Sequence, residues 1–199
     1  MMRKIIYMFL MSVLVCTTSC LDKFPDNAVS ESKAITTVEE ANQAVVGIYS
    51  SFLSSALYSG YLTLLPDVQC DLLYAVNGYS NKYGNVWRWD ILATNSEIEA
   101  VYGSLYSLIG NCNFMLDNAA KLMPTLVDDD DVDRLEKLCG EAYFARALAY
   151  SELIKLFCED YKSDDDAKTK LGVVVRTSYY NAQPIVRSSL YESYAQVLA

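Results

Sequence analysis

The sequence contains no histidine, and this absence excludes several kinds of active site. Ser-His-Asp and Cys-His nucleophile systems need an imidazole base, and many zinc sites need imidazole ligands. A basic patch is missing as well, because 16 Lys+Arg stand against 25 Asp+Glu in 199 residues, a formal net charge of −9. A protein that binds a nucleic-acid backbone replaces phosphate counterions with Lys and Arg. We therefore expect no nucleic-acid partner, and catalysis is restricted to carboxylates, tyrosines or lysines.

Apolar runs are also short. The chain opens with Arg3 and Lys4, followed by the mostly apolar stretch Ile5–Val15. This stretch is shorter than the roughly 20 residues of a membrane-spanning helix, and its basic start is typical of a secretory signal peptide. A buried N-terminal strand or helix is the alternative. The following segment, CTTSC at residues 16–20, resembles a bacterial lipobox, in which the cysteine is acylated. We interpret residues 1–19 as a lipoprotein signal peptide and Cys20 as the lipidation site.

Four cysteines remain after the lipidation site: Cys70, Cys112, Cys139 and Cys158. An exported protein can form disulfides, but small buried hydrophobic residues are the favoured interpretation of these four. Their spacing matches neither a metal site nor a CxxC redox pair. No metal and no cofactor are expected.

The remaining sequence predicts helices. Residues 20–36 are polar and contain Pro25, as expected of a lipid-anchored tether. Apolar residues then recur at intervals of three or four through residues 37–199, which we expect to form a helical domain. Helices are expected to begin at Thr37, Ser96, the acidic run Asp128–Asp131 and Ser189. Three of these starts are S/T-x-x-E capping boxes, and the acidic run suits the positive end of a helix dipole.

The other segments are expected to be irregular. Residues 59–94 are rich in aromatics, with one short helix expected around Pro66–Tyr74. Lys162–Lys170 is predicted to be a charged loop, and Gly172–Val175 a short extended piece. The last helix has no stop signal before Ala199, so the helical domain is expected to be incomplete at its C-terminus. The fold class is mostly α, with tetratricopeptide-like antiparallel helix pairs and long aromatic-rich loops.

Two carboxylate clusters were considered as sites. Asp129, Asp131 and Asp133 have EF-hand spacing, but the loop lacks the required glycine at position 6 and glutamate at position 12. A solvated helix cap is the better interpretation. Asp67 and Asp71 would share a face if both were helical, which is one requirement of a carboxylate glycosidase. A chance pair is the favoured explanation in so acidic a chain, and no catalytic residue is predicted.

The aromatic segment Tyr83–Asp90 is the candidate binding surface. If it is extended, Trp87 and Trp89 lie on one side and, with Tyr83, offer flat apolar faces on which a sugar ring can stack. The alternative is that both tryptophans fill the core, and this alternative is favoured. Arg146, between small Ala residues, is expected to have a structural role, in an ion pair or on backbone carbonyls.

Four stretches of the chain resemble the SusD/RagB family of outer-membrane lipoproteins from Bacteroidetes glycan-uptake systems. Cys20–Pro25 is similar to its C-x-D-x-x-P mature start, and Thr37–Phe52 to its first helix. Val101–Leu116 resembles its W-x-x-x-Y-x-x-I-x-x-x-N motif. Gly140–Phe157 (GEAYFARALAYSELIKLF) resembles A-E-A-x-F-x-R-A-x-x-Y-x-x-L-x-x-x-F-G, which is the most specific of the four.

The resemblance implies a surface-exposed lipoprotein, anchored to the outer membrane, that captures an oligosaccharide without cleaving it. Its implied partner is a SusC-like TonB-dependent transporter, to which it delivers the ligand. The family's glycan contacts come largely from loops beyond this stretch, so the resemblance assigns no binding residue here. Two alternatives stay open: a helical interaction scaffold without its own ligand, and a lipid-anchored carboxylate glycosidase.

Overall fold

The computed structural model describes residues 35–76, 83–180 and 185–198. The predicted signal peptide, Cys20 and most of the predicted tether lie outside the described residues. The chain divides into two units, Met1–Ala34 and Ile35–Ala199, and the following description concerns the second unit alone. Ile35 and Thr36, the last two residues of the expected tether, take part in it: Ile35 is buried, and Thr36 donates to the Glu40 carboxylate.

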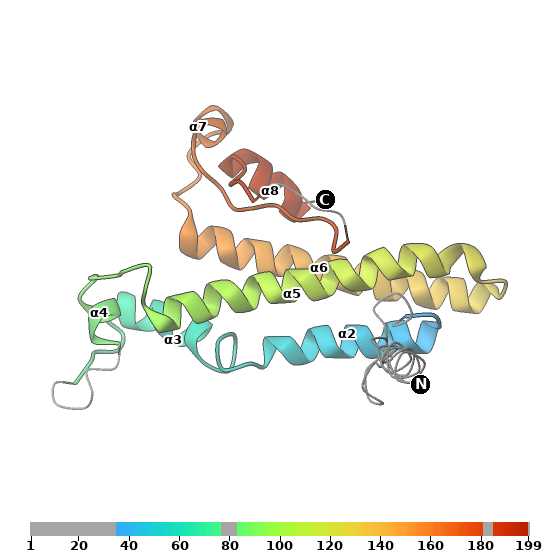
Figure 1. Ribbon diagram of the computed structural model, residues 1–199. Coiled ribbons are helices and arrows are strands. Elements are labelled where there is room, and N and C mark those ends of the chain that lie inside the picture. Colours follow the sequence, from blue (N-terminus) through green and yellow to red (C-terminus); the bar gives the residue numbers. More distant parts are fainter. Residues whose placement is uncertain (1–34, 77–82, 181–184, 199) are drawn as a thin grey trace, which may run out of the picture. The chain divides into compact units, whose positions relative to one another are not determined.

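Helices dominate the described residues. Their bounds are α2 Val38–Phe52, α3 Tyr61–Gln69, α4 Gly84–Trp87, α5 Ser96–Leu122, the 3₁₀ helix η2 Met123–Thr125, α6 Asp129–Phe157, α7 Asp164–Thr169 and α8 Leu190–Leu198 (Figure 1). In the described ranges the β structure is limited to an isolated antiparallel bridge between Leu171 and Ser189. The expected mostly α fold is confirmed. None of the helices within these ranges has the length and apolarity that a membrane crossing requires.

The core lies between three long helices. In Figure 1, α5 and α6 form an antiparallel hairpin that turns at η2, and α2 runs alongside in the direction of α6. Ala142, Ala145 and Ala149 are fully buried on α6 and allow close approach of the neighbouring helices. Leu105 and Leu108 face them from α5 and are fully buried too. Burial of this apolar stripe, rather than helix propensity alone, stabilises helices of this length.

Two of the three predicted capping boxes are confirmed. The Thr37 hydroxyl accepts from the Glu40 N–H at 3.2 Å while the Glu40 carboxylate accepts from the Thr37 N–H at 3.0 Å. Ser189 and Glu192 make the same reciprocal pair before α8. The predicted box at Ser96 is wrong. Asn95 is the N-cap residue of α5, and its Oδ1 accepts from the Leu92 N–H of the preceding turn.

Several other expectations need correction. The helix predicted around Pro66–Tyr74 is α3, which begins at Tyr61 and ends at Gln69. Asp71 follows it with φ of 62°, so Asp67 and Asp71 do not share a helix face. The predicted loop Lys162–Lys170 contains α7, because the Ser163 hydroxyl caps it and three aspartates occupy its positive first turn. The apolar spacing of residues 190–198 also predicts that Leu198 faces the core, but this residue is 87% exposed.

The cysteines of the described residues are free thiols. Cys112 is buried in the core, and burial raises its thiol pKa to about 12, so it behaves as a hydrophobic side chain. Cys139 and Cys158 are half-buried. Cys70 is exposed and departs from the buried-hydrophobe interpretation.

Candidate functional site

An extended segment, Gly172–Ser178, runs along the α5–α6 hairpin before α8, and its successive residues contact Tyr106, Asn113 and Asp117 of α5. Within the described ranges its backbone lies beside no strand beyond the isolated bridge at Leu171, yet Val173 and Val174 are buried. Buried N–H and C=O groups must find partners. Two tyrosine hydroxyls supply them: Tyr106 accepts from the Val174 N–H at 2.9 Å and donates to its carbonyl at 3.1 Å. Tyr150 does the same for Arg176, at 2.7 and 2.8 Å.

The other edge of this segment is held by α8 and the residues before it. The Val173 N–H donates to the Ser193 hydroxyl at 2.9 Å, and the Val173 carbonyl accepts from the Ser188 N–H at 2.9 Å. Gly172 permits this approach, because a Cβ there would collide with Ser193 Oγ and the Ser189 carbonyl. Alternate residues of an extended chain point their backbone groups to opposite edges. Helix tyrosines therefore take the place of a sheet neighbour at one edge, and the Ser188 backbone with the Ser193 hydroxyl holds the other edge.

Burial keeps the hydroxyls of Tyr106 and Tyr150 protonated, as their paired hydrogen bonds to the segment require. It raises the pKa of the Tyr106 phenol, helped by a hydrogen bond with Tyr102, and it raises the pKa of the Tyr150 phenol. Both hydroxyls stay protonated at neutral pH, and a protonated hydroxyl can donate and accept at once.

Asn113 adds a third buried hydrogen bond to the backbone of Arg176. Its Nδ2 donates to the Arg176 carbonyl at 2.9 Å, and its Oδ1 accepts from Arg146 Nη1 at 2.9 Å. Arg146 is buried, and its guanidinium also lies 5.0 Å from the centre of the Tyr143 ring. Its structural role is as expected, but the partner is an amide oxygen rather than a carboxylate or a backbone carbonyl.

The segment then turns next to Asp117 of α5. One carboxylate oxygen of Asp117, on α5, accepts from the Ser178 hydroxyl at 2.7 Å, the Tyr179 N–H at 2.8 Å and the Tyr180 N–H at 3.3 Å. The Phe114 ring packs edge-on against Tyr179, with ring centres 5.0 Å apart. These contacts fix the position of the Tyr179 ring over α5.

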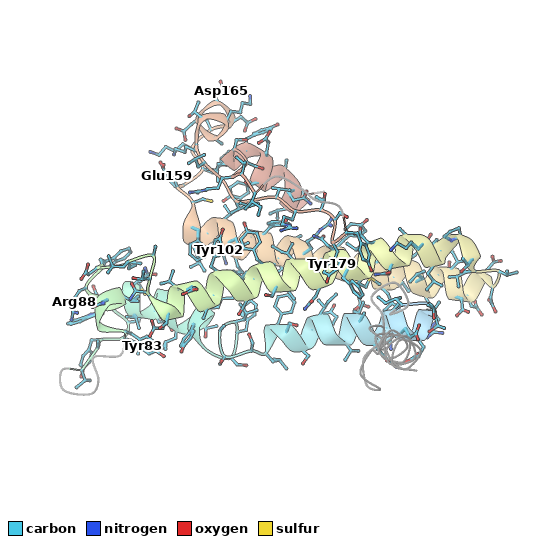
Figure 2. All side chains as sticks on the ribbon, viewed as in Figure 1. Tyr83, Arg88, Tyr102, Glu159, Asp165 and Tyr179 are labelled. Atoms are coloured by element: carbon cyan, nitrogen blue, oxygen red, sulfur yellow. The ribbon has the colours of Figure 1, made fainter. Side chains whose placement is uncertain are left out.

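A pocket of about 420 Å³ lies between α5 and this segment, within the range of small-ligand sites. Figure 2 labels Tyr102, from α5, and Tyr179, from the segment before α8. The pocket is lined by Tyr102, Gly103, Tyr106, Ile109, Gly110, Asn113, Val174, Arg176, Ser178, Tyr179 and Ile185. Gly103 and Gly110 leave the α5 side bare, since a Cβ at either position would meet nothing within 4 Å. The site combines aromatic rings, an apolar floor and few polar groups.

Comparison with known families matches residues 20–199 to a SusD-like family described as starch-binding and associating with the outer membrane. The chain belongs to the SusD-like family. A curated relative, the SusD-like protein P2 of Formosa agariphila, is 26% identical over 155 residues, which are 77% of this chain and 29% of that protein. The chain thus spans less than a third of that relative's length.

Two crystal structures from Bacteroides thetaiotaomicron share the fold of this SusD-like chain. One is a SusD superfamily protein with a TM-score of 0.65 and 22% identity, covering 81% of this chain and 35% of the other. The second is a SusD homolog with a TM-score of 0.67 and 21% identity, covering 84% and 29%. The helical architecture of the SusD-like family is therefore shown for this chain.

The residues predicted as ligand contacts lie apart from the pocket. Tyr83, Trp87 and Trp89 are absent from its lining. The predicted extended conformation is wrong, because Trp87 belongs to α4 and Trp89 follows it with φ of 59°. Trp87 packs partly against the core, whereas Trp89 is 67% exposed. The two tryptophans therefore neither lie together on one side of a strand nor both fill the core. Tyr83 contacts the Tyr61 ring edge-on, with centres 6.1 Å apart.

Sequence reasoning missed the pocket, although α5 carries a signal for it. Tyr102 and Tyr106 are four residues apart, and Gly103 and Gly110 are seven apart, so all four lie toward one side of the helix. Glycine inside a helix costs about 0.5–1 kcal/mol relative to alanine. Two such glycines beside two tyrosines indicate a helix face that is kept open rather than packed.

Proposed function

We propose that this SusD-like protein is a cell-surface lipoprotein of the outer membrane that binds an oligosaccharide without cleaving it. The ligand is then delivered to a SusC-like TonB-dependent transporter. The observation that carries the proposal is the pocket beside α5, with the rings of Tyr102, Tyr106 and Tyr179 around an apolar floor. Tyrosine rings present a broad apolar face that suits the C–H face of a sugar ring.

The domain organisation is part of the proposal. Residues 1–19 form the signal peptide, residues 20–36 the tether, and residues 37–199 the helical domain, with Cys20 carrying the lipid. Several acyl chains on one cysteine give firm anchoring, at about 0.8 kcal/mol per buried CH₂.

Replacing Cys20 tests this anchor. Cys20→Ala is expected to move the protein from the outer-membrane fraction to the soluble fraction, because the acylated side chain is lost. Cys16→Ala is the matched control, since Cys16 lies in the signal peptide and leaves with it. Fractionation followed by immunoblotting measures both. Membrane retention of Cys20→Ala, equal to that of Cys16→Ala, would contradict the lipid anchor.

Trp89, with Tyr83 and Trp87 behind it, is proposed as a second sugar contact. Isothermal titration against a panel of oligosaccharides tests both the function and this contact. Trp89→Ala is expected to weaken binding about threefold to tenfold, the value of one stacked ring, with unchanged stability. Trp87→Ala is expected to lower the unfolding temperature, because its ring packs against the core.

The same panel of oligosaccharides separates the two alternative functions, glycosidase and scaffold. Release of reducing sugar during incubation would favour the glycosidase, and binding to no oligosaccharide would favour the scaffold.

One observation supports a protein partner, whether the chain is an oligosaccharide-binding protein or a scaffold. Val46 and Tyr49 are exposed apolar residues on one face of α2, and Leu53, its C-cap residue, is exposed next along the chain. Exposed apolar patches of this kind mark surfaces that contact other proteins.

A further inference from the structure

Among the described residues, the pocket beside α5 is lined by one charged side chain, that of Arg176. In the part of the chain that the structure describes, its guanidinium pairs with no carboxylate and makes no hydrogen bond. We propose that this pocket selects an acidic saccharide, whose carboxylate or sulfate group pairs with Arg176. This inference rests on the proposed oligosaccharide binding and specifies the class of sugar.

The direction of the Arg176 side chain follows from the extended backbone. Val174, Arg176 and Ser178 line the pocket, whereas Val175 and Thr177 between them do not. Side chains at every second position of an extended segment share a face. The pocket therefore receives the side chains of this alternating set, in which Arg176 is the cation.

Three other polar side chains of the pocket are already engaged within the protein. The Tyr106 hydroxyl binds both backbone groups of Val174. Asn113 uses its amide nitrogen on the Arg176 carbonyl and its oxygen on Arg146. The Ser178 hydroxyl donates to Asp117. The guanidinium of Arg176 is thus the strong donor left for a ligand, and a guanidinium prefers a carboxylate or a sulfate-like anion in bidentate geometry.

The fold holds Arg176 in place before any ligand arrives. Its N–H and carbonyl groups make three hydrogen bonds, two with the Tyr150 hydroxyl and one with Asn113. Tyr150 and Asn113 come from different helices and are buried. A fixed backbone reduces the ordering cost of binding, and so favours a role in ligand recognition over a merely solvated charge.

The electrostatic surroundings agree with an anionic ligand. Asp117 is the carboxylate nearest to the turn of the segment, and its Oδ2 is already surrounded by one hydroxyl and two N–H donors. Arg146 lies below Asn113 and adds a second positive charge on that side of the hairpin. The overall charge of the chain is negative, so this cationic pocket is a local exception that gives selectivity.

The test compares three tetrasaccharides on the purified protein by isothermal titration. Tetragalacturonate carries carboxylates, a κ-carrageenan tetrasaccharide carries sulfate esters, and maltotetraose is neutral. One or both acidic sugars should bind more tightly than maltotetraose, and the two acidic arms identify the anion. Arg176→Gln should weaken acidic binding about tenfold to a hundredfold and leave neutral binding unchanged. Arg176→Lys, which keeps the charge, should recover part of the loss.

Arg88→Gln is the matched control, because Arg88 is exposed near α4, outside the pocket lining, and hydrogen-bonds Asn85 (Figure 2). It should leave all three affinities unchanged. Equal affinity for acidic and neutral sugars, or an equal loss in Arg176→Gln and Arg88→Gln, would overturn the inference while the proposed function stands. Binding to none of these sugars or of the wider panel would contradict the proposed function itself.

Discussion

Tyr150→Phe is expected to lower the free energy of unfolding by about 2–3 kcal/mol, although it removes a single oxygen atom. The lost hydroxyl serves the N–H and the carbonyl of Arg176, inside the protein. Removing one partner of a buried hydrogen bond costs about 1–3 kcal/mol for each group left without a partner. The Arg176 carbonyl keeps its bond from Asn113, so most of the loss comes from the N–H. Urea denaturation measures the change.

Tyr143→Phe is the matched control for this substitution. Tyr143 lies on the same helix, its side chain is about half exposed, and its ring rather than its hydroxyl faces Arg146. Its loss of a hydroxyl should change stability by no more than about 0.5 kcal/mol. Faster amide exchange at Val174 and Arg176 in Tyr150→Phe would show that the extended segment is the part released. Equal stabilities of the two variants would contradict the role given to Tyr150.

The tyrosines show where sequence reasoning stops. Tyr150 lies in the family-like stretch Gly140–Phe157 and Tyr106 in the family-like stretch Val101–Leu116, and neither stretch predicts a hydrogen-bond partner for its tyrosine. Each bonds a residue far along the chain: Tyr106 reaches Val174, and Tyr150 reaches Arg176. A hydroxyl partner at such separation leaves no local periodic signal. The use of helix tyrosines in place of neighbouring strands could therefore be read only from the folded chain.

The local elements were predictable because their causes are local. Thr37 with Glu40 and Ser189 with Glu192 carry their partners within four residues, and both boxes form. Ser96 fails for an equally local reason, since Asn95 is also a strong cap residue and its side chain is used by the preceding turn. The α5–α6 pair follows from apolar spacing, whereas the buried polar pair Asn113 and Arg146 does not, because it depends on the alignment of two helices.

The tryptophans illustrate the same limit at the candidate site. The prediction that Trp87 and Trp89 share one side assumes that Tyr83–Asp90 is extended. Instead, Gly84–Trp87 forms a helical turn and Trp89 adopts a left-handed backbone conformation. Two aromatic residues two positions apart therefore have different environments. The aromatic side chains of the segment indicate that it could stack on a sugar ring. Which of the two tryptophans is exposed depends on the backbone conformation, and it is Trp89.

Gly110→Leu is expected to have opposite effects on stability and on ligand binding. A Cβ added at Gly110 meets no atom within 4 Å, and Gly110 lines the pocket. Replacing a helical glycine should raise the free energy of unfolding by about 0.5–1 kcal/mol. The same side chain occupies the space in which the ligand would lie beside Tyr106, so oligosaccharide affinity should fall at least tenfold. Thermal denaturation and isothermal titration measure the two quantities on one sample.

Gly140→Leu separates these two effects. Gly140 is an exposed position inside α6, where an added Cβ also meets nothing within 4 Å, and it lies outside the pocket lining. It should gain the same helix stability and keep full affinity for the sugar. Because the two substitutions are chemically identical, a loss of binding in Gly110→Leu alone can come only from the pocket. Full binding by Gly110→Leu would instead move the sugar site away from α5 and leave the surface around Trp89 as the remaining candidate.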